Sequence, residues 1–335
     1  MNILLCRLIV LVVFLLCSSV VKSQETVRIA HPEWSSAKVI SGLLKVVIED
    51  RLNGKAELVP GAVNDVIYTS MHLGNGEIDI HPDVWLPNQE NFTKLYVENK
   101  KTVKLSKNSY VGRSGFCVSK EFSQKYNVTS IHDLLNPEIA ELADIDNNGK
   151  GDIWVGNFSW LANKINRVKL KSYGLSNLYR HYSDKEDVVR EKMNSPKNAN
   201  KHFIYYCYEP NHSWVSGNQV MLVEPKYDRN NNYMTWPNEN PRWYKMSKVK
   251  TADKLKAVHV GYSTSVDRKS PVVSSFLENI QLDTPMVNAM VHELVIKKRN
   301  VEDIAREWVK NNPERVDSWL VNTVKVDKTI GALVK

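Results

Sequence analysis

The strongest constraint on the fold is an alternation of short apolar runs and helical patterns near the start of the chain. A run at 27–30 precedes an apolar stripe of helical spacing over 37–52, and a run at 56–59 precedes a second helical pattern ending at Gly74. A third run at 78–80 follows, and we expect Pro32 and Pro82 to end the first and third strands. This order predicts a parallel sheet with helices on its faces. Ligands of such sheets bind at the carboxyl ends of the strands.

The length and the later pattern predict two lobes in an α/β protein. A chain of 335 residues exceeds what one hydrophobic core usually holds. An apolar run over 110–119 is expected to cross into the second lobe. We therefore place the first lobe at 24–112, the second at 113–212, and a return to the first lobe with the C-terminal helices at 213–335. Asn300 and Pro313 should begin two of those helices.

The first 23 residues have the pattern of a cleaved export signal. Arg7 precedes an uninterrupted apolar run over 8–17, which is shorter than the ~20 residues of a spanning helix. Cleavage would lower the formal net charge from +8 to +6, and the remaining basic residues alternate with acids, so we expect no nucleic-acid partner. Export also leaves Cys117 and Cys207 in an oxidising compartment, where they can pair; two buried free thiols are the alternative.

Aromatic residues gather at the ends of predicted elements. Trp34 and Trp85 follow strands, Trp160 follows a turn-like stretch, Tyr208 ends a strand, and Trp214 lies a few residues further on. These rings lie off helical stripes, so they are free to converge from loops. A quaternary ammonium group has no N–H to donate, and it is held by aromatic faces worth ~0.5–2 kcal/mol each. The pattern therefore favours an aromatic box for a methylated cation.

Several segments make a family resemblance specific. These segments are 31–34 (HPEW), 76–87 (GEIDIHPDVWLP), 115–118 (GFCV), 149–154 (GKGDIW), 171–174 (KSYG), 206–210 (YCYEP) and 312–320 (NPERVDSWL). With them the sequence resembles the glycine betaine/proline betaine family of periplasmic substrate-binding proteins, closest to the branch that contains trimethylamine N-oxide receptors.

The resemblance implies a two-lobed periplasmic-binding-protein fold (type II-like) with crossing hinge strands, which closes on its ligand. It implies a monomeric receptor and not an enzyme. This receptor would capture a small osmolyte in the periplasm, without a cofactor, and deliver it to the membrane permease of an ABC importer. Trp34, Trp85 and Trp160 would form the aromatic box, and Tyr208 falls where relatives have Trp or Tyr.

The sequence leaves open which residues contact the end of the ligand opposite its methylated ammonium group. The sequence departs from the family after Pro210, so whether Trp214 or His212 reaches the ligand is open. Asn157 or His212 can donate to an anionic end. A nearby acid, Glu33 or Asp83, would instead favour a net cation such as choline.

An acidic loop has the start of a calcium-binding pattern. Hard cations need clustered oxygen ligands, and a glycine supplies the sharp turn. We predict a structural Ca²⁺ here, with Lys150 contributing its backbone carbonyl; a polar turn is the alternative, because Val155 stands where a calcium loop has glutamate. The predicted ligands are Asp144, Asp146, Asn148, Lys150 and Asp152.

Two other classes of function remain as alternatives. A zinc receptor or metalloenzyme would use His31 and His81, which each precede a proline at a predicted strand end, but the chain has no HExxH motif. A hydrolase would need a nucleophile motif, and no Gly-x-Ser-x-Gly is present. The osmolyte receptor is therefore the leading hypothesis.

Overall fold

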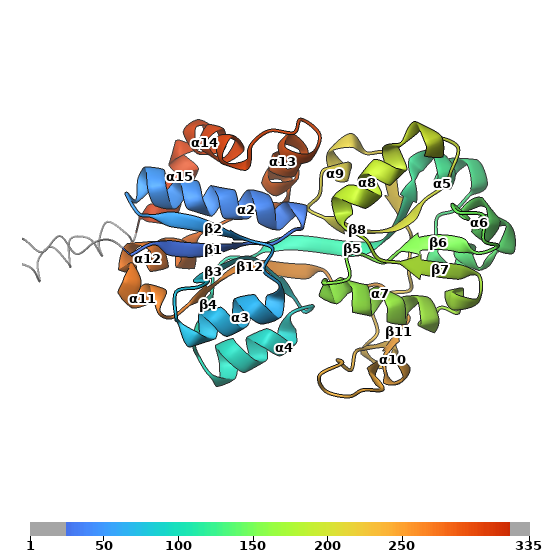
Figure 1. Cartoon of the computed structure of the whole chain (residues 1–335), viewed down its shortest axis with the longest axis horizontal. Coiled ribbons are helices and arrows are strands. Elements are labelled where there is room, and N and C mark those ends of the chain that lie inside the picture. The colour runs from blue at the N-terminus through green and yellow to red at the C-terminus, as the bar shows by residue number, and fades with distance from the viewer. Residues whose placement is uncertain (1–24, 322–335) are drawn as a thin grey trace, which may run out of the picture.

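The computed structural model describes residues 25–321, so the predicted export signal over 1–23 lies outside the described part. Two lobes lie side by side, and each holds a sheet with helices on its faces (Figure 1). The strand β5 (Tyr110–Ser119) runs from one lobe into the other. The predictions of an α/β protein, of two lobes and of a crossing strand at 110–119 are confirmed.

The first lobe is built on the alternation that opens the chain. β1 pairs in parallel with both β2 and β3, which gives the order β2-β1-β3, and β12 then lies antiparallel to β3. The strands of this lobe are β1 (Val27–His31), β2 (Ala56–Pro60), β3 (Ile80–Leu86), β4 (Val103–Leu105) and β12 (Lys256–Ser263).

Helices cover both faces of the first sheet (Figure 1). As predicted, the Asn300 side chain caps α14 by accepting from the backbone N–H of Glu302, and Pro313 opens α15. No helix within residues 25–321 is long and apolar enough to cross a membrane. The helices are α2 (Ser35–Val46) running into η1 (Val47–Arg51), α3 (Asn64–Leu73), α4 (Glu90–Thr93) running into η2 (Lys94–Asn99), α11 (Val266–Lys269), α12 (Pro271–Asn279), α13 (Thr284–Val295), α14 (Val301–Asn311) and α15 (Pro313–Leu320).

In the second lobe the sheet continues from β5, which pairs with β12, in the order β5-β8-β6-β7, with β9 on the other side of β5. Its strands are β6 (Gly151–Trp154), β7 (Tyr179–Tyr182), β8 (Ile204–Glu209) and β9 (Gln219–Met221), with a separate ribbon of β10 (Asn232–Tyr233) and β11 (Lys248–Val249). Its helices are α5 (Lys120–Tyr126), η3 (Ile131–Leu135), α6 (Pro137–Leu142), α7 (Leu161–Ser172), η4 (Leu175–Asn177), α8 (Glu186–Asn194), η5 (Pro196–Asn198), α9 (Ser213–Ser216), η6 (Arg229–Asn231) and α10 (Trp243–Met246).

The expected end of the third strand at Pro82 is wrong. β3 begins at Ile80 and continues through Pro82 to Leu86. The pairing of β3 with β12 shifts register between His259 and Gly261, opposite Pro82. A proline lacks an N–H for the ladder, and a register shift is where that loss is tolerated. As a result, Trp85 lies inside a strand and not in a loop.

The expected return to the first lobe at residue 213 is also wrong. β9 still pairs with β5 in the second sheet, and the chain re-enters the first lobe only with β12 at Lys256. The segment between them packs Trp236 and Trp243 against Ile165 and Val168 of α7. This burial holds the long loop on the second lobe, so residues 213–253 belong to that lobe.

Candidate functional site

A cavity of about 490 Å³ lies between the two lobes and is lined by aromatic rings. This volume is within the roughly 300–1,000 Å³ that is usual for small-molecule pockets. Trp34, which immediately precedes α2, and Trp85 on β3 come from the first lobe. Trp160, which immediately precedes α7, and Tyr208 on β8 come from the second. The four rings predicted to share one site therefore line one cavity.

Tyr208 connects the rings of the two lobes. Its ring lies edge-on to Trp85, with centroids 5.8 Å apart, and edge-on to Trp160 at 5.9 Å. Tyr206 on the same strand face adds a ring 6.3 Å from Trp160 and also lines the cavity. Because Phe158 also lines the cavity, the second lobe contributes four rings and the first lobe two.

Asp83 fixes the two indoles of the first lobe. Its fully buried carboxylate accepts hydrogen bonds from the indole N–H of Trp34 at 2.6 Å and of Trp85 at 2.9 Å. The hydroxyls of Ser36 at 2.6 Å and Tyr110 at 2.5 Å complete its four donors. Burial and the Asp83 charge raise the pKa of Tyr110 well above its usual value, so its hydroxyl remains a donor.

Glu186, at the start of α8, holds Tyr208 by a hydrogen bond in the way that Asp83 holds the two indoles. The Tyr208 hydroxyl donates to the Glu186 carboxylate at 2.9 Å, and the Asn211 side chain donates to it at 2.7 Å. Burial, followed by the Glu186 charge, raises the pKa of Tyr208 well above its usual value. Ser35 of the first lobe reaches the same carboxylate with its hydroxyl at 3.1 Å. Glu186 therefore connects a ring of the cavity to the opposite lobe.

Glu33 and Asn157 both line the cavity. Glu33 forms an ion pair with Lys185 of the second lobe at 3.1 Å. The Asn157 side-chain oxygen accepts from the backbone of Ser159, which shapes the turn before Trp160. Both residues were candidates from the sequence, whereas Lys185 was not.

Trp214 and His212 do not line the aromatic cavity. The Trp214 indole donates to the backbone oxygen of Tyr208 at 2.8 Å, and the guanidinium of Arg113 lies 4.3 Å from the centre of its ring. Trp214 therefore supports the end of β8 from outside the aromatic cavity. His212 faces a different cavity of the second lobe. The segment after Pro210, where the sequence departs from the family, carries both side chains away from the aromatic cavity.

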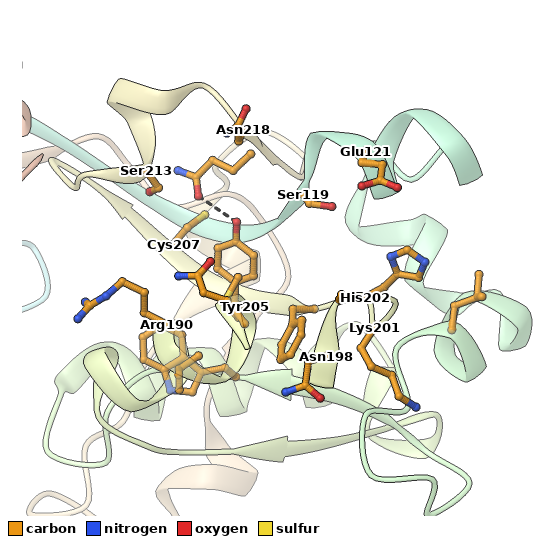
Figure 2. Close-up of a pocket in the computed structure, with 18 of the residues that line it drawn as sticks. Ser119, Glu121, Arg190, Asn198, Lys201, His202, Tyr205, Cys207, Ser213 and Asn218 are labelled. Atoms are coloured by element: carbon orange, nitrogen blue, oxygen red, sulfur yellow. Dashed lines mark hydrogen bonds between the residues drawn. The ribbon is translucent and has the colours of Figure 1, made fainter. Parts of the chain in front are cut away.

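That second cavity, shown in Figure 2, has a volume of about 1,670 Å³. It is far wider than a small-molecule pocket needs to be. The Tyr205 hydroxyl, which donates to Gln219 at 3.1 Å, and Cys207 lie at its centre. Tyr205 and Cys207 line only this wide cavity, whereas Tyr206 and Tyr208 line both cavities.

Cys117 and Cys207 form a disulfide in the structure. It joins β5, the crossing strand, to β8, the strand that carries Tyr208. The bond closes a loop with a sequence separation of 90 residues. It therefore ties the second lobe's part of the aromatic cavity to the strand on which the lobes meet.

The two histidines of the metal alternative are engaged as neutral side chains. His81 is fully buried and accepts from the backbone N–H of Asp83 through Nδ1, which leaves Nε2 to donate to Asn64 at 2.9 Å. Burial lowers the pKa of His81 to about 3. The Nδ1 of His31 lies 2.6 Å from the Ser41 hydroxyl. Among the described residues, the group of acids and histidines spaced for a metal includes neither histidine.

The group of side chains that is spaced for a metal lies in the acidic loop. Oxygens of Asp144, Asp146 and Asp152 lie within 4.8 Å of one another. Arg180 forms ion pairs with Asp146 and Asp152, the latter at 2.8 Å, and so already supplies positive charge. The side chain of Asn148 accepts from the backbone of Lys150 within the turn. Calcium at this loop stays a prediction, which a calcium titration followed by thermal melting tests.

A buried charge network, not predicted from the sequence, lies where the chain passes between the lobes. Asp253 accepts from Ser114 of β5 at 3.0 Å and pairs with Lys256 at 3.3 Å. Lys169 of α7 has no exposed surface and pairs with Glu224 at 2.9 Å. Burial alone would raise the pKa of Asp253, but Lys169 and Lys256 hold it well below its usual range. Two positive and two negative side chains thus balance at the hinge.

These features define a class of protein: a two-lobed receptor that encloses a small ligand between its lobes. Residues 25–311 match the family model described as the substrate-binding domain of ABC-type glycine betaine transport systems, and the chain belongs to that family. This family consists of substrate-binding receptors. The family resemblance read from the sequence is confirmed.

Curated relatives agree with this assignment. A glycine betaine/proline betaine-binding periplasmic protein of Escherichia coli K12 is 22% identical over 277 residues, covering 79% of this chain and 80% of the relative. A glycine betaine-binding periplasmic protein of Dickeya dadantii is 20% identical over 270 residues, covering 76% and 77%.

Two solved structures share the fold. An ABC-transporter choline-binding protein in complex with choline has a TM-score of 0.68 at 15% identity, covering 90% of this chain and 93% of that one. Lactococcal OpuAC, closed around glycine betaine, has a TM-score of 0.66 at 16% identity, covering 88% and 99%.

Proposed function

We propose that this protein captures a small methylated ammonium osmolyte, from the class that includes glycine betaine, trimethylamine N-oxide and choline, in the aromatic cavity. The observation that carries the proposal is that Trp34, Trp85, Trp160 and Tyr208 line one cavity of suitable volume from two lobes. A methylated ammonium group has no N–H, so hydrogen-bonding pockets gain little from it, whereas ring faces attract it. The names of the relatives and of the structural neighbours, which include glycine betaine and choline, support this ligand class.

The mechanism follows from the division of the rings between the lobes. A ligand that contacts Trp85 on one side and Trp160 on the other stabilises the closed arrangement over the open one, because only differential affinity shifts such an equilibrium. Contacts across the mouth, from Glu33 to Lys185 and from Ser35 to Glu186, form in the same arrangement. The closed receptor then delivers the ligand to the membrane permease of an ABC importer.

The place of action follows from the relatives. Both curated relatives described above are periplasmic. An export signal at 1–23, cleaved on secretion, would bring this chain to the same compartment, where a disulfide between Cys117 and Cys207 persists. We propose a monomeric periplasmic receptor without catalytic activity.

A thermal-shift screen with matched ligand pairs tests the proposal. Glycine betaine is compared with glycine, and choline with ethanolamine, so that only the methyl groups differ within each pair. A ligand at 100 times its Kd stabilises the native state by about 2.7 kcal/mol. We expect a raised Tm with at least one methylated compound and none with its unmethylated partner. Equal shifts within every pair, or no shift with any compound, would refute the proposal.

A further inference from the structure

The polar groups of three cavity rings share one unusual property, which is that each donates to a carboxylate. The indole N–H groups of Trp34 and Trp85 donate to Asp83, and the Tyr208 hydroxyl donates to Glu186. The remaining indole, Trp160, has a buried N–H without a partner. Negative charge therefore stands directly behind the rings of both lobes.

Neither carboxylate is neutralised by a cationic side chain. All the donors to Asp83 are uncharged hydroxyl and indole groups, and the donors to Glu186 are hydroxyl, amide and backbone groups. In the described part of the chain, neither acid forms an ion pair. A buried charge that is hydrogen-bonded but not paired leaves an uncompensated field in its surroundings.

The charged residues of the cavity wall do not offset the negative charges of Asp83 and Glu186. The charged side chains that line it are Glu33, Asp184 and Lys185. Lys185 is engaged by Glu33 at the mouth. Counting Asp83 and Glu186 behind the rings, acids outnumber bases in and around the cavity. The inside of the cavity is therefore electronegative.

Hydrogen bonding to a carboxylate also changes the rings themselves. A donor N–H or O–H that is bound by an anion becomes more polarised, and electron density moves toward the ring. The face of such a ring attracts a cation more strongly. The charge behind the rings and the polarisation of the rings act in the same direction.

We propose that this cavity selects ligands with a net positive charge, such as methylated ammonium alcohols, over zwitterionic betaines and neutral N-oxides. This inference rests on the proposed function and adds the charge class of the ligand. A zwitterion gains from its ammonium group but also brings a carboxylate into the same negative field. A hydroxyl end carries no such charge, and the neutral amides of Asn64 and Asn157 lie in the wall to bind it.

Calorimetric titration of the unaltered protein tests the proposal with four ligands of similar head shape. These are choline, glycine betaine, trimethylamine N-oxide and 3,3-dimethylbutan-1-ol, the uncharged carbon analogue of choline. We expect choline to bind at least tenfold more tightly than glycine betaine and the N-oxide, and at least 100-fold more tightly than the carbon analogue. Glycine betaine or the N-oxide binding as tightly as choline would overturn this inference and leave the proposed function standing. No binding by any of the four would overturn both.

Two variants locate the selectivity in the carboxylates. We expect D83N and E186Q each to narrow the ratio of choline to glycine betaine affinity by at least fivefold. E191Q, on the exposed side of α8, serves as the control and should leave the ratio unchanged within twofold. Thermal melting checks folding; if D83N does not fold, E186Q and the ligand series decide the question. An unchanged ratio in the folded variants would show that the carboxylates do not set the selectivity.

Discussion

At the scale of single residues, the cavity depends on side chains that hold the rings as much as on the rings. Asp83 lies two residues before Trp85, so the two side chains share one face of β3. The carboxylate can therefore orient the Trp85 indole within its own strand and the Trp34 indole from the neighbouring loop. A ring held in this way loses little rotamer entropy when a ligand arrives.

Trp85→Ala should weaken the binding of the methylated ligand at least tenfold. The substitution removes one ring face and the edge contact with Tyr208, together worth more than about 1.4 kcal/mol. Calorimetric titration measures the change. The control is Trp308→Ala, which removes an indole that stacks on Trp319 in the first lobe, away from the cavity. Equal affinities for the wild type and Trp85→Ala would remove this ring from the site.

His81 should make the protein less stable as the pH falls below neutrality. Burial lowers its pKa from 6.5 to about 3 in the folded state. Between these values the unfolded chain binds a proton that the native state does not, so the free energy of unfolding falls by about 1.4 kcal/mol per pH unit from this residue. Urea denaturation at pH 7, 6 and 5 should show a smaller pH slope for His81→Gln than for the wild type. Identical pH slopes for the two proteins would contradict the lowered pKa of His81 in the folded state.

At the scale of elements, regular periodicity is what the sequence predicts well. The first strand, the helix after it and the second strand lie where their apolar spacing places them, and two helices begin as predicted, one capped by Asn300 and one with Pro313 as its first residue. The predicted end of the third strand was wrong. The rule that a proline ends a strand takes no account of the register shift opposite Pro82. That shift depends on β12, which lies more than 170 residues further along the chain.

In the site, as in the fold, local features could be predicted from the sequence, whereas long-range contacts could not. The four rings could be predicted because each lies at or near the end of an element, which is a local feature. Glu186 could not, since nothing in its own segment marks it, and its partner Ser35 is 151 residues away in the sequence. Trp214 was a candidate by the same local rule, and it was excluded only by the way the segment after Pro210 folds. Long-range pairing is what the sequence pattern leaves undetermined.

Breaking the buried charge network at the hinge should strongly destabilise the protein. Lys169→Met leaves Glu224 without its buried cation and leaves Asp253 with Lys256 alone, and removing one partner of a buried ion pair costs about 3–5 kcal/mol. The matched control is Lys297→Met, which breaks an exposed pair with Glu293 worth about 0–1 kcal/mol. Chemical denaturation compares the two variants. A loss for Lys169→Met no larger than the loss for Lys297→Met would contradict the account of the hinge.

At the scale of the whole molecule, the structure has the lobes in contact across the mouth of the cavity. Ser35 to Glu186 and Glu33 to Lys185 are the polar contacts nearest the rings. Both contacts join segments that lie next to box residues, Trp34 in one lobe and the partner of Tyr208 in the other. Closure and ligand binding are therefore expected to be coupled through them.

Removing both cross-mouth contacts should speed ligand release. In the double variant Ser35→Ala/Lys185→Met, the rings are intact but the closed state loses about 1–2 kcal/mol, which corresponds to a roughly tenfold faster dissociation. Stopped-flow tryptophan fluorescence measures the dissociation rate. Ser318→Ala, at an exposed position of α15, is the control. An unchanged dissociation rate would show that the two contacts have no part in closure.

The most direct test of the whole account is a crystal structure with a bound methylated ammonium ligand such as choline. We predict that the ligand nitrogen lies within about 6 Å of the ring centres of Trp34, Trp85, Trp160 and Tyr208, the range over which a ring face attracts a cation. A ligand found instead in the wider cavity beside Cys207 and His212, or at any place with no indole in that range, would contradict it.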